Sequence, residues 1–495
     1  MAVDQNTKII FGLKVKQLRK QYDLSFQELK DLSGLSVSYL NEIEKGKKYP
    51  RQNKIDALAA ALNTTSEELV SPQLSKNLMP LAELLESNFL QELPLDLFGI
   101  EAAKVVEIIA NAPTKVGAFI SSLVEISRKY ELRQQHFYFS ALRSYQEMHN
   151  NFFEEIEDEV SVFTKENRLS TSSSISSETL MRLLQRKYKY KIEQDGLSDY
   201  EELKSLRSVF IPKRKRLLLN YDLNDSQKAF VLGKEMAFNH LKLKDRLYTS
   251  TFLKVKSFDQ VLNNFKAAYF SNALLINKEG LIADLNNFFK LNRWNSMALF
   301  AIMDKYQASP EMFLHRLTNL IPQYFGIEDL FFLRFNNKPG SKKYYLTKEL
   351  HLNRQHRPHG NEIDQHYCRR WVSIWLFDNL QKLQETNRYV KPVIEVQRSK
   401  YLGSEDEYFC ITIASPGHPT PDTNISVTIG FYINEKLKET IRFWDDDNIP
   451  SRWVNVTCER CPAVDCEERA VTASFIERSN KMKSMEDTLK SVLER

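Results

Sequence analysis

Residues 25–49 constrain the fold of this 495-residue chain more tightly than any other segment. Ser25 can cap a short helix, and Glu28, three residues later, completes a capping-box pattern. Gly34 can adopt the positive φ that ends such a helix, and Ser36 can cap a second one. The segment therefore predicts two short helices joined by a tight turn.

Apolar residues at helical spacing predict three further helices around this pair. One helix precedes the pair, one follows it, and a short fifth helix is capped by Thr65. The residues expected to face a shared core are Phe11, Val15, Leu18, Leu29, Leu32, Leu40, Ile43, Ile55, Leu58, Ala59, Leu62 and Leu69.

Five short helices at this spacing resemble the Cro/repressor-type (XRE) helix-turn-helix domain, over residues 8–70. The resemblance implies an all-α head that binds double-stranded DNA, with the second helix of the pair in the major groove. An ordinary small helical bundle and an intact domain of this type that binds a protein remain as alternatives. The residues that carry the resemblance are Leu29, Gly34, Ser36, Leu40, Ile43, Glu44, Gly46, Ala59, Leu62 and Leu69.

The resemblance also implies individual DNA contacts. Asn41 could pair with adenine, and Val37 could touch a thymine methyl group. The family often has Gln at the position of Phe26, so Gln27 is the candidate replacement for that contact. The implied base-facing residues are Ser36, Val37, Ser38 and Asn41, and the implied phosphate-binding residues are Lys45, Lys47 and Lys48.

Charge and composition agree with this interpretation. Residues 8–54 carry 11 Lys and Arg against 5 Asp and Glu, although the whole chain has a net charge of only +5. The length predicts about three domains. Five cysteines in so long a chain indicate a reducing cytoplasm rather than a disulfide framework, and no run of 18 apolar residues predicts a membrane span.

The sequence of the middle of the chain predicts a helix that contains a lone glutamate between a lysine and a phenylalanine. Asn224 can cap a helix that contains Lys234-Glu235-x-x-Phe238, and this helix resembles that of the IrrE/ImmA-type zinc peptidases. In that family, His-Glu-x-x-His supplies two zinc ligands and a general base. Here Lys234 and Phe238 occupy both ligand positions, and Asn264 stands near the third. The later segment 309–320 resembles the closing helix of the same family.

The resemblance therefore implies a zincin-like body that has lost its zinc site, a pseudo-peptidase without enzymatic activity. Ahead of this body, helical periodicity predicts a connector over residues 71–150. The acidic run from Glu154 to Glu159 is expected to form a solvated helix face.

Three cysteines near the C-terminus form a metal-knuckle pattern. Cys458 and Cys461 have C-x2-C spacing, and Cys466 follows closely. Cys368 is the natural fourth ligand for zinc, with His366 as a second candidate. Reduced thiols without metal and a redox-active pair remain as alternatives. Cys410 lies within one of the strands expected over residues 391–434 and is assigned to the core.

The cysteine pattern, with Cys368-Arg-Arg-Trp371, also resembles the C-terminal domain of the short-chain fatty acid regulator group of XRE proteins. This group implies a transcription regulator that responds to a small metabolite such as a short-chain acyl-CoA. A homodimer is expected because one short recognition helix reads too few bases. The alternative is a metalloprotease-type stress regulator that cleaves a repressor, whereas a toxin–antitoxin or phage-type partner-binding protein is disfavoured by the length.

The expected fold is multidomain, with five parts in order along the chain. They are an all-α five-helix DNA-binding head (1–70), a helical connector (71–150), an α+β zincin-like body lacking the zinc site (151–335), a mixed α/β cysteine-bearing domain (336–480) and an exposed helical tail (481–495).

Overall fold

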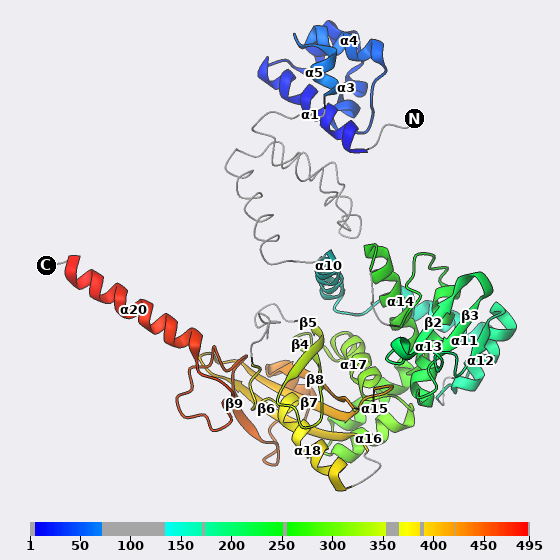
Figure 1. Cartoon of the computed structure of the whole chain (residues 1–495), viewed down its shortest axis with the longest axis vertical. Coiled ribbons are helices and arrows are strands. Elements are labelled where there is room, and N and C mark those ends of the chain that lie inside the picture. Colours follow the sequence, from blue (N-terminus) through cyan, green and yellow to red (C-terminus); the bar gives the residue numbers. More distant parts are fainter. Residues whose placement is uncertain are drawn as a thin grey trace. The chain divides into compact units, whose positions relative to one another are not determined.

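The computed structural model describes residues 5–71, 134–170, 174–250, 255–352, 366–386, 391–420 and 422–493. The chain divides into two compact units, residues 1–141 and 142–495 (Figure 1). Most of the expected connector lies outside the described residues, apart from helix α10 (Gln134–Met148). No helix among the described residues is long and apolar enough to cross a membrane.

Residues 5–71, which we call the head, contain five helices, as predicted. The Ser25 hydroxyl accepts a hydrogen bond from the Glu28 amide, and the Glu28 carboxylate accepts one from the Ser25 amide, so the capping box is present. Gly34 ends the second helix with φ +69°. The helices are α1 (Gln5–Gln21), α2 (Phe26–Ser33), α3 (Val37–Glu44), α4 (Gln52–Ala61) and α5 (Ser66–Val70).

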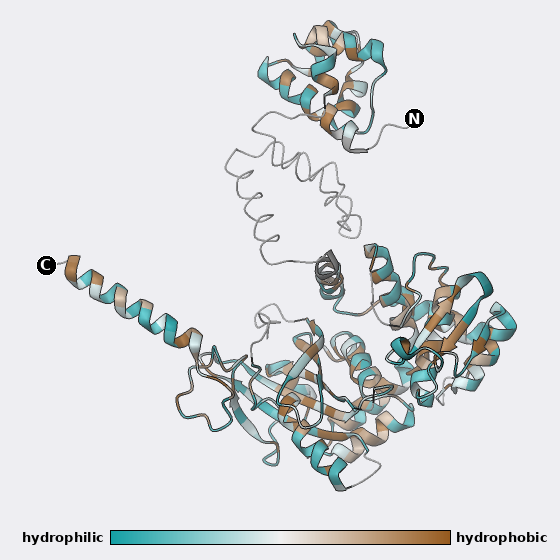
Figure 2. Ribbon diagram, viewed as in Figure 1, coloured by the Kyte–Doolittle hydropathy of each residue, from teal (hydrophilic) through white to brown (hydrophobic). Residues whose placement is uncertain are grey.

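The head core forms where the apolar faces of these helices meet (Figure 2). All but one of the twelve predicted core residues lie in it or pack against it. The exception is Leu32, which is 60% exposed. Ser33 is buried in its place because the inner face of α2 runs from Leu29 to Ser33, four residues apart, and the Ser33 hydroxyl donates to the Leu29 carbonyl.

Close packing in the head depends on Gly12. A Cβ at this position would lie 2.1 Å from the carbonyl oxygen of Ile43, so α1 can approach the end of α3 only without a side chain there. This contact fixes the position of α3 against the rest of the head.

The second unit begins with helices and a small sheet. Helices α11 (Glu154–Glu166) and α12 (Ser177–Tyr188) precede strands β1 (Lys191–Glu193), β2 (Ser208–Ile211) and β3 (Arg216–Leu219). The strand order is β1-β3-β2, with β1 parallel and β2 antiparallel to β3. One turn of 3-10 helix, η4 (Pro212–Arg214), joins β2 to β3, and a second, η3 (Glu201–Leu203), precedes β2.

Five helices follow this sheet: α13 (Asp225–His240), α14 (Phe258–Leu275), α15 (Lys278–Phe289), α16 (Ser296–Lys305) and α17 (Pro310–Phe325). Asn224 caps α13, as predicted, in a capping box with Gln227. A Cβ on Gly233 would lie 2.3 Å from the Ser271 hydroxyl oxygen, so this glycine allows α13 and α14 to pack closely. That packing positions the next two residues, Lys234 and Glu235.

The sequence predicted that the acidic run in α11 forms a solvated face, but one of its acidic residues is buried. Glu157 is 3% exposed and forms two hydrogen bonds with Arg316 of α17, of 2.5 and 3.0 Å. Its helix neighbours Ile156 and Val160 are also buried. The prediction was wrong for Glu157 because its cationic partner is distant in the sequence.

A six-stranded sheet occupies most of the remaining chain, in the order β5-β4-β8-β7-β6-β9. Neighbouring strands are antiparallel, except that β9 is parallel to β6. Helix α18 (Val372–Thr386) packs against this sheet (Figure 1). The strands are β4 (Leu330–Asn337), β5 (Tyr344–His351), β6 (Val393–Tyr401), β7 (Glu407–Pro416), β8 (Asn424–Tyr432) and β9 (Ser451–Val454).

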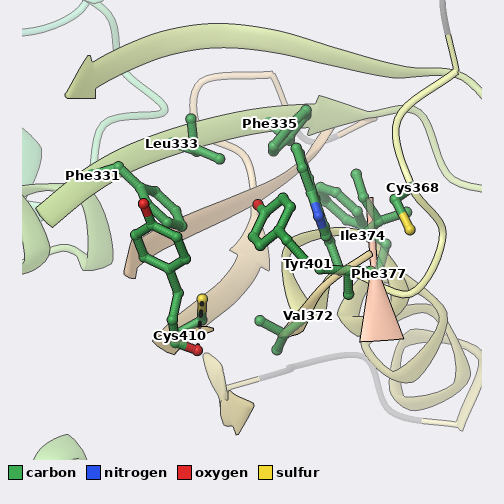
Figure 3. Packing of buried hydrophobic residues seen from close by; sticks show 12 residues of the cluster. Phe331, Leu333, Phe335, Cys368, Val372, Ile374, Phe377, Tyr401 and Cys410 are labelled. Atoms are coloured by element: carbon green, nitrogen blue, oxygen red, sulfur yellow. Dashed lines mark hydrogen bonds between the residues drawn. The ribbon is translucent and has the colours of Figure 1, made fainter. Parts of the chain in front are cut away.

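Aromatic side chains fill the space between this sheet and α18. Figure 3 shows Phe331, Tyr401 and Cys410 from the sheet together with Phe377 from α18. The strands expected within residues 391–434 are confirmed, and Cys410 is buried in the core, as predicted. Helix α19 (Glu435–Thr440) follows β8, and α20 (Ser474–Leu493) forms the tail with no buried residue.

The domain boundaries expected from the sequence remain predictions. The boundary expected between residues 335 and 336 falls within β4, which pairs along its length with β8. Residues on either side of it therefore share one sheet.

Candidate functional site

The first candidate site is the outer face of α3. The Ser36 hydroxyl accepts a hydrogen bond from the Tyr39 amide at 3.3 Å, so Ser36 caps the helix, as predicted. Val37 and Ser38 are exposed, and Asn41 is half-buried. On the opposite face, Leu40 and Ile43 are fully buried. The helix thus presents a small polar face that begins at its N-terminus.

Basic residues follow directly after α3. Lys45, Lys47 and Lys48 are all exposed, and the Lys48 ammonium lies 3.2 Å from the Glu42 carboxylate. Gly46, with φ +65°, turns the chain between them. These positions are suited to phosphate contacts at the edge of a surface formed by α3.

Phe26 has a structural role in this head. The Arg19 guanidinium lies over its ring at 4.2 Å and also forms two hydrogen bonds with the Glu44 carboxylate, of 2.6 and 3.0 Å. Phe26 therefore helps to hold the arginine that links α1 to the end of α3. Gln27 is exposed, and its amide donates to Asp31 at 3.4 Å.

The second candidate site lies on α13, where the peptidase-like pattern was found. The Lys234 ammonium donates to the Asn264 side-chain oxygen at 2.7 Å, so two of the positions expected near zinc in the related peptidases are in direct contact. The third, Phe238, packs its ring against the Arg246 guanidinium at 3.8 Å. The fold brings these positions together, although none of these three side chains is a zinc ligand.

Arg246 closes the site over Glu235. Its guanidinium forms two hydrogen bonds with the Glu235 carboxylate, of 2.5 and 2.8 Å, and lies between the rings of Phe238 and Phe210. The Tyr190 hydroxyl donates to the same carboxylate at 2.9 Å. Burial, followed by the nearby Glu235, raises the pKa of Tyr190 well above its usual range. The glutamate that would act as a general base is thus fully engaged by protein groups.

The edge of the small sheet is also closed. The Phe210 amide donates to the Tyr248 carbonyl at 2.7 Å, and the Ser250 amide donates to the Ser208 carbonyl at 3.1 Å. Together with a bridge between Val209 and Thr249, these bonds pair residues 248–250 with the outer side of β2. A peptide could not add to this edge without displacing them.

A small pocket remains beside Lys234, with a volume of about 40 Å³. We call it the Lys234 pocket. Its described lining residues are Arg207, Ser208, Phe230, Val231, Lys234, Glu235, Phe238, Arg246, Leu247, Tyr248, Thr249, Ser250 and Asn264.

The residues of this site do not fit the zinc ion that IrrE/ImmA-type peptidases use. Cys, His, Asp and Glu side chains bind zinc, whereas an ammonium group and a phenyl ring stand at the two ligand positions of α13. Within the parts of the chain that the structure describes, no group of three or more His, Cys, Asp or Glu side chains is arranged to hold a metal ion.

The cysteine segments lie next to each other. The Cys368 amide donates to the Val456 carbonyl at 3.2 Å, and the Cys458 amide donates to the His366 carbonyl at 2.8 Å. Cys368, Cys458 and Cys461 are buried, whereas Cys466 is half-buried. The His366 ring is engaged by Glu459, at 2.9 Å.

Arg469 holds part of this cluster in place, and burial affects the ionisation of its thiols. Arg469 donates to the carbonyl oxygens of Cys458 and Cys461, at 2.8 and 3.2 Å. Burial raises the pKa of the Cys368 thiol to about 11, and the nearby Cys458 and Cys461 add to this shift. The thiol of Cys368 is therefore protonated at neutral pH unless a metal ion or another cation stabilises the thiolate.

Sequence reasoning missed Arg246 and Tyr190, the two residues that bind Glu235. Tyr190 precedes β1 and Arg246 follows α13, so neither belongs to the pattern around Glu235. No local signal identifies them, because their contact with Glu235 depends on the folded chain.

Family models agree with two of the three resemblances, those to the helix-turn-helix and the IrrE-like families. Residues 15–69 match the helix-turn-helix family model, and residues 195–318 match the model for the IrrE N-terminal-like domain. A search of curated proteins gave no match. Among solved structures, a Mycobacterium tuberculosis transcriptional regulator is similar, with 15% identity over 68% of this chain and 93% of that chain and a TM-score of 0.45.

The chain thus carries a helix-turn-helix domain of the XRE type, the class that binds DNA, ahead of an IrrE-like domain. The membership in the short-chain fatty acid regulator group and the metal at the cysteines stay predictions.

The buried Glu235–Arg246 pair gives a testable prediction. Replacement of Arg246 by Ala leaves a buried carboxylate without its counter-charge and should destabilise the second unit by about 3–5 kcal/mol. Chemical denaturation followed by tryptophan fluorescence would measure this loss. The double variant Arg246→Met with Glu235→Met should recover most of it, because no unpaired charge remains.

Arg216→Ala is the matched control, since Arg216 pairs with Glu193 at a more exposed position. Water screens that pair, so its loss should change stability far less. Equal effects of Arg246→Ala and Arg216→Ala would contradict a structural role for the buried pair.

Proposed function

We propose that this protein is a sequence-specific transcriptional regulator that binds double-stranded DNA as a homodimer and responds to a small metabolite such as a short-chain acyl-CoA. The observation that carries the proposal is the outer face of α3, where a capped N-terminus, exposed Val37 and Ser38 and half-buried Asn41 precede three exposed lysines. The match of residues 15–69 to the helix-turn-helix family supports it.

The alternative function is proteolysis, as in a metalloprotease that cleaves a repressor. The match of residues 195–318 to the IrrE-like family favours this alternative. The contacts of the site favour the regulator, because Lys234 and Phe238 replace zinc ligands and Arg246 engages Glu235. We therefore propose that the IrrE-like domain is a pseudo-peptidase used as a sensor.

A homodimer is part of this proposal because one short helix reads too few bases, and twofold symmetry places two such helices roughly 34–36 Å apart, one turn of DNA. Helix α20 offers a surface for the second copy. Met482, Met485, Leu489 and Val492 follow coiled-coil spacing, and each is more than half exposed.

The charges beside this stripe favour a parallel pair of α20 helices. If Met482 and Leu489 occupy a positions, then Lys481 is at g and Glu486 at the following e position. In a parallel pair, g of one helix faces that e position of the other, which brings opposite charges together.

For DNA binding, the double variant Val37→Ala and Asn41→Ala should lose sequence preference while it keeps weak, salt-sensitive binding. Loss of a bidentate contact from Asn41 costs about 1–3 kcal/mol of discrimination, and loss of the Val37 methyl contact adds to it, whereas the phosphate contacts remain. Affinities for selected and scrambled duplexes, measured by fluorescence anisotropy at several salt concentrations, would test this.

Asn53→Ala with Val70→Ala is a control of matched composition. Both residues are exposed, but they lie in the region of α4 and α5. The control should bind as the wild type does. If the α3 variant kept the wild-type preference for the selected duplex over the scrambled one, α3 would not be the recognition helix.

For the dimer, Met485→Lys places a charge in the centre of the apolar stripe of α20 and should shift the protein from dimer to monomer. Analytical ultracentrifugation of the full chain over a range of concentrations would measure the shift. Ser484→Lys, on the adjacent polar face, should leave the dimer intact. A dimer unaffected by Met485→Lys would place the interface elsewhere.

We also propose that the cysteine cluster binds a structural zinc ion through Cys368, Cys458, Cys461 and Cys466. The burial of Cys368, Cys458 and Cys461 and the hydrogen bonds between the two segments support this assignment. In this structure the four thiols do not form a group arranged to hold a metal ion, so zinc binding would require them to move closer together. A bound Zn²⁺ would stabilise the thiolates, which are otherwise disfavoured by burial, and would tie the two segments together.

Metal analysis tests this assignment. Elemental analysis of purified protein should find zinc in the wild type, its loss in Cys461→Ser and its retention in Cys410→Ser, because Cys410 lies in the β7 core. Zinc kept in Cys461→Ser but lost in Glu235→Gln would instead support the peptidase alternative.

A further inference from the structure

Positive charge exceeds negative charge around the Lys234 pocket. Arg207, Lys234 and Arg246 line it, whereas Glu235 is the single carboxylate among its described lining residues. Glu235 already receives hydrogen bonds from Arg246 and Tyr190. The pocket therefore keeps cationic groups whose charge its own lining does not balance.

A neighbouring cluster does not correct this imbalance. Glu311 of α17 is contacted by Arg334 at 3.2 Å, by Lys348 and, at 3.9 Å, by Arg207. These three cations hold the pKa of Glu311 far below its usual range, although burial alone would raise it. One carboxylate thus serves three cations, so Arg207 has little anionic compensation here.

The excess of positive charge around the pocket affects the charge state of Lys234. Its ammonium donates to Asn264, which is neutral and cannot balance its charge. Burial lowers the pKa of Lys234 to about 7; Glu235 opposes this shift, while Arg246, Lys348 and Arg207 add to it. An anion in the pocket would reverse the effect of the neighbouring cations and favour the charged lysine.

The size of the pocket limits what it can hold. A volume of about 40 Å³ corresponds to roughly three water molecules at 10–15 Å³ each. This space suits a carboxylate or an oxyanion of similar size, but not a whole peptide or nucleotide. Ser208, Thr249 and Ser250, whose side chains carry hydroxyl groups, are also among the lining residues, and the Ser250 hydroxyl oxygen accepts hydrogen bonds from the Arg207 and Ser208 amides.

We propose that the Lys234 pocket binds a small oxyanion, a carboxylate or a phosphate group, through Lys234 and Arg207. The corresponding site in IrrE-like peptidases holds a zinc cation. Here Lys234 stands at a zinc-ligand position, and its positive charge favours an anion instead. The claim that an effector acts at this pocket rests on the proposed regulatory function. The claim that the pocket binds an anion does not depend on that function.

Calorimetric titration of the full chain with sodium acetate, sodium sulfate and inorganic phosphate tests the proposal. Comparison of the three affinities shows whether the pocket prefers a carboxylate or a phosphate-like anion. Wild type should bind at least one of them with saturation. Lys234→Met, which keeps the length and apolar stem of the side chain, should weaken binding at least tenfold. Lys213→Met, in the exposed turn between β2 and β3, should bind normally.

Proton uptake distinguishes this site from surface binding. Near pH 8 much of Lys234 is neutral, because its pKa is about 7. Binding of acetate or sulfate should therefore take up a proton, seen as a binding enthalpy that depends on the ionisation enthalpy of the buffer. Affinity should fall as the pH rises from 6 to 8.5, and both effects should be absent in Lys234→Met.

Arg207→Met is the second variant, in case Lys234→Met fails to fold, and should also weaken binding at least tenfold. The proposal is overturned if no anion binds wild type with saturation, or if both variants keep wild-type affinity. DNA binding is measured on the same samples. Anion binding without DNA binding would reject the regulatory function alone, and DNA binding without anion binding would reject the Lys234 pocket alone.

Discussion

The buried pair between Glu157 and Arg316 holds the second unit together. Arg316 is fully buried, and it also donates to the Ile276 carbonyl at 3.2 Å. The Tyr269 hydroxyl donates to Glu157 at 2.8 Å, so α11, α14 and α17 meet at one charged centre. Burial alone would raise the pKa of Glu157, but Arg316 and Tyr269 lower it. Because α17 also packs against β4 and β8, this centre links the peptidase-like helices to the six-stranded sheet.

Local patterns predicted the head well. The caps at Ser25 and Ser36 and the positive φ of Gly34 depend on residues within four positions, so the sequence contains all the information needed. The prediction placed Leu32 in the core, but Ser33 is buried instead. In a helix of eight residues, apolar spacing cannot decide whether the residue three or four positions after Leu29 faces the core. The contacts of Glu157 with Arg316 could not be predicted, since 159 residues separate the partners.

At the site on α13, too, some features can be predicted from the local sequence and others depend on the fold. The substitutions at Lys234 and Phe238 are visible in the sequence, and they indicate that the zinc ligands are missing. The surroundings of Glu235 are visible only in the fold, where Arg246 supplies a positive charge to this carboxylate and the rings of Phe238 and Phe210 contact the guanidinium. The glutamate is retained as half of an internal ion pair, so its presence in the motif says little about catalysis.

Arg246 also bears on how such a site can evolve. Zinc binding at this site would need new ligands in place of Lys234 and Phe238 and the removal of Arg246. Loss of the arginine first leaves Glu235 buried without a partner, and a metal ion brought in first meets a guanidinium in its place. We therefore expect either order of single substitutions to pass through a destabilised protein. A zinc site could therefore arise here only if several substitutions occurred together.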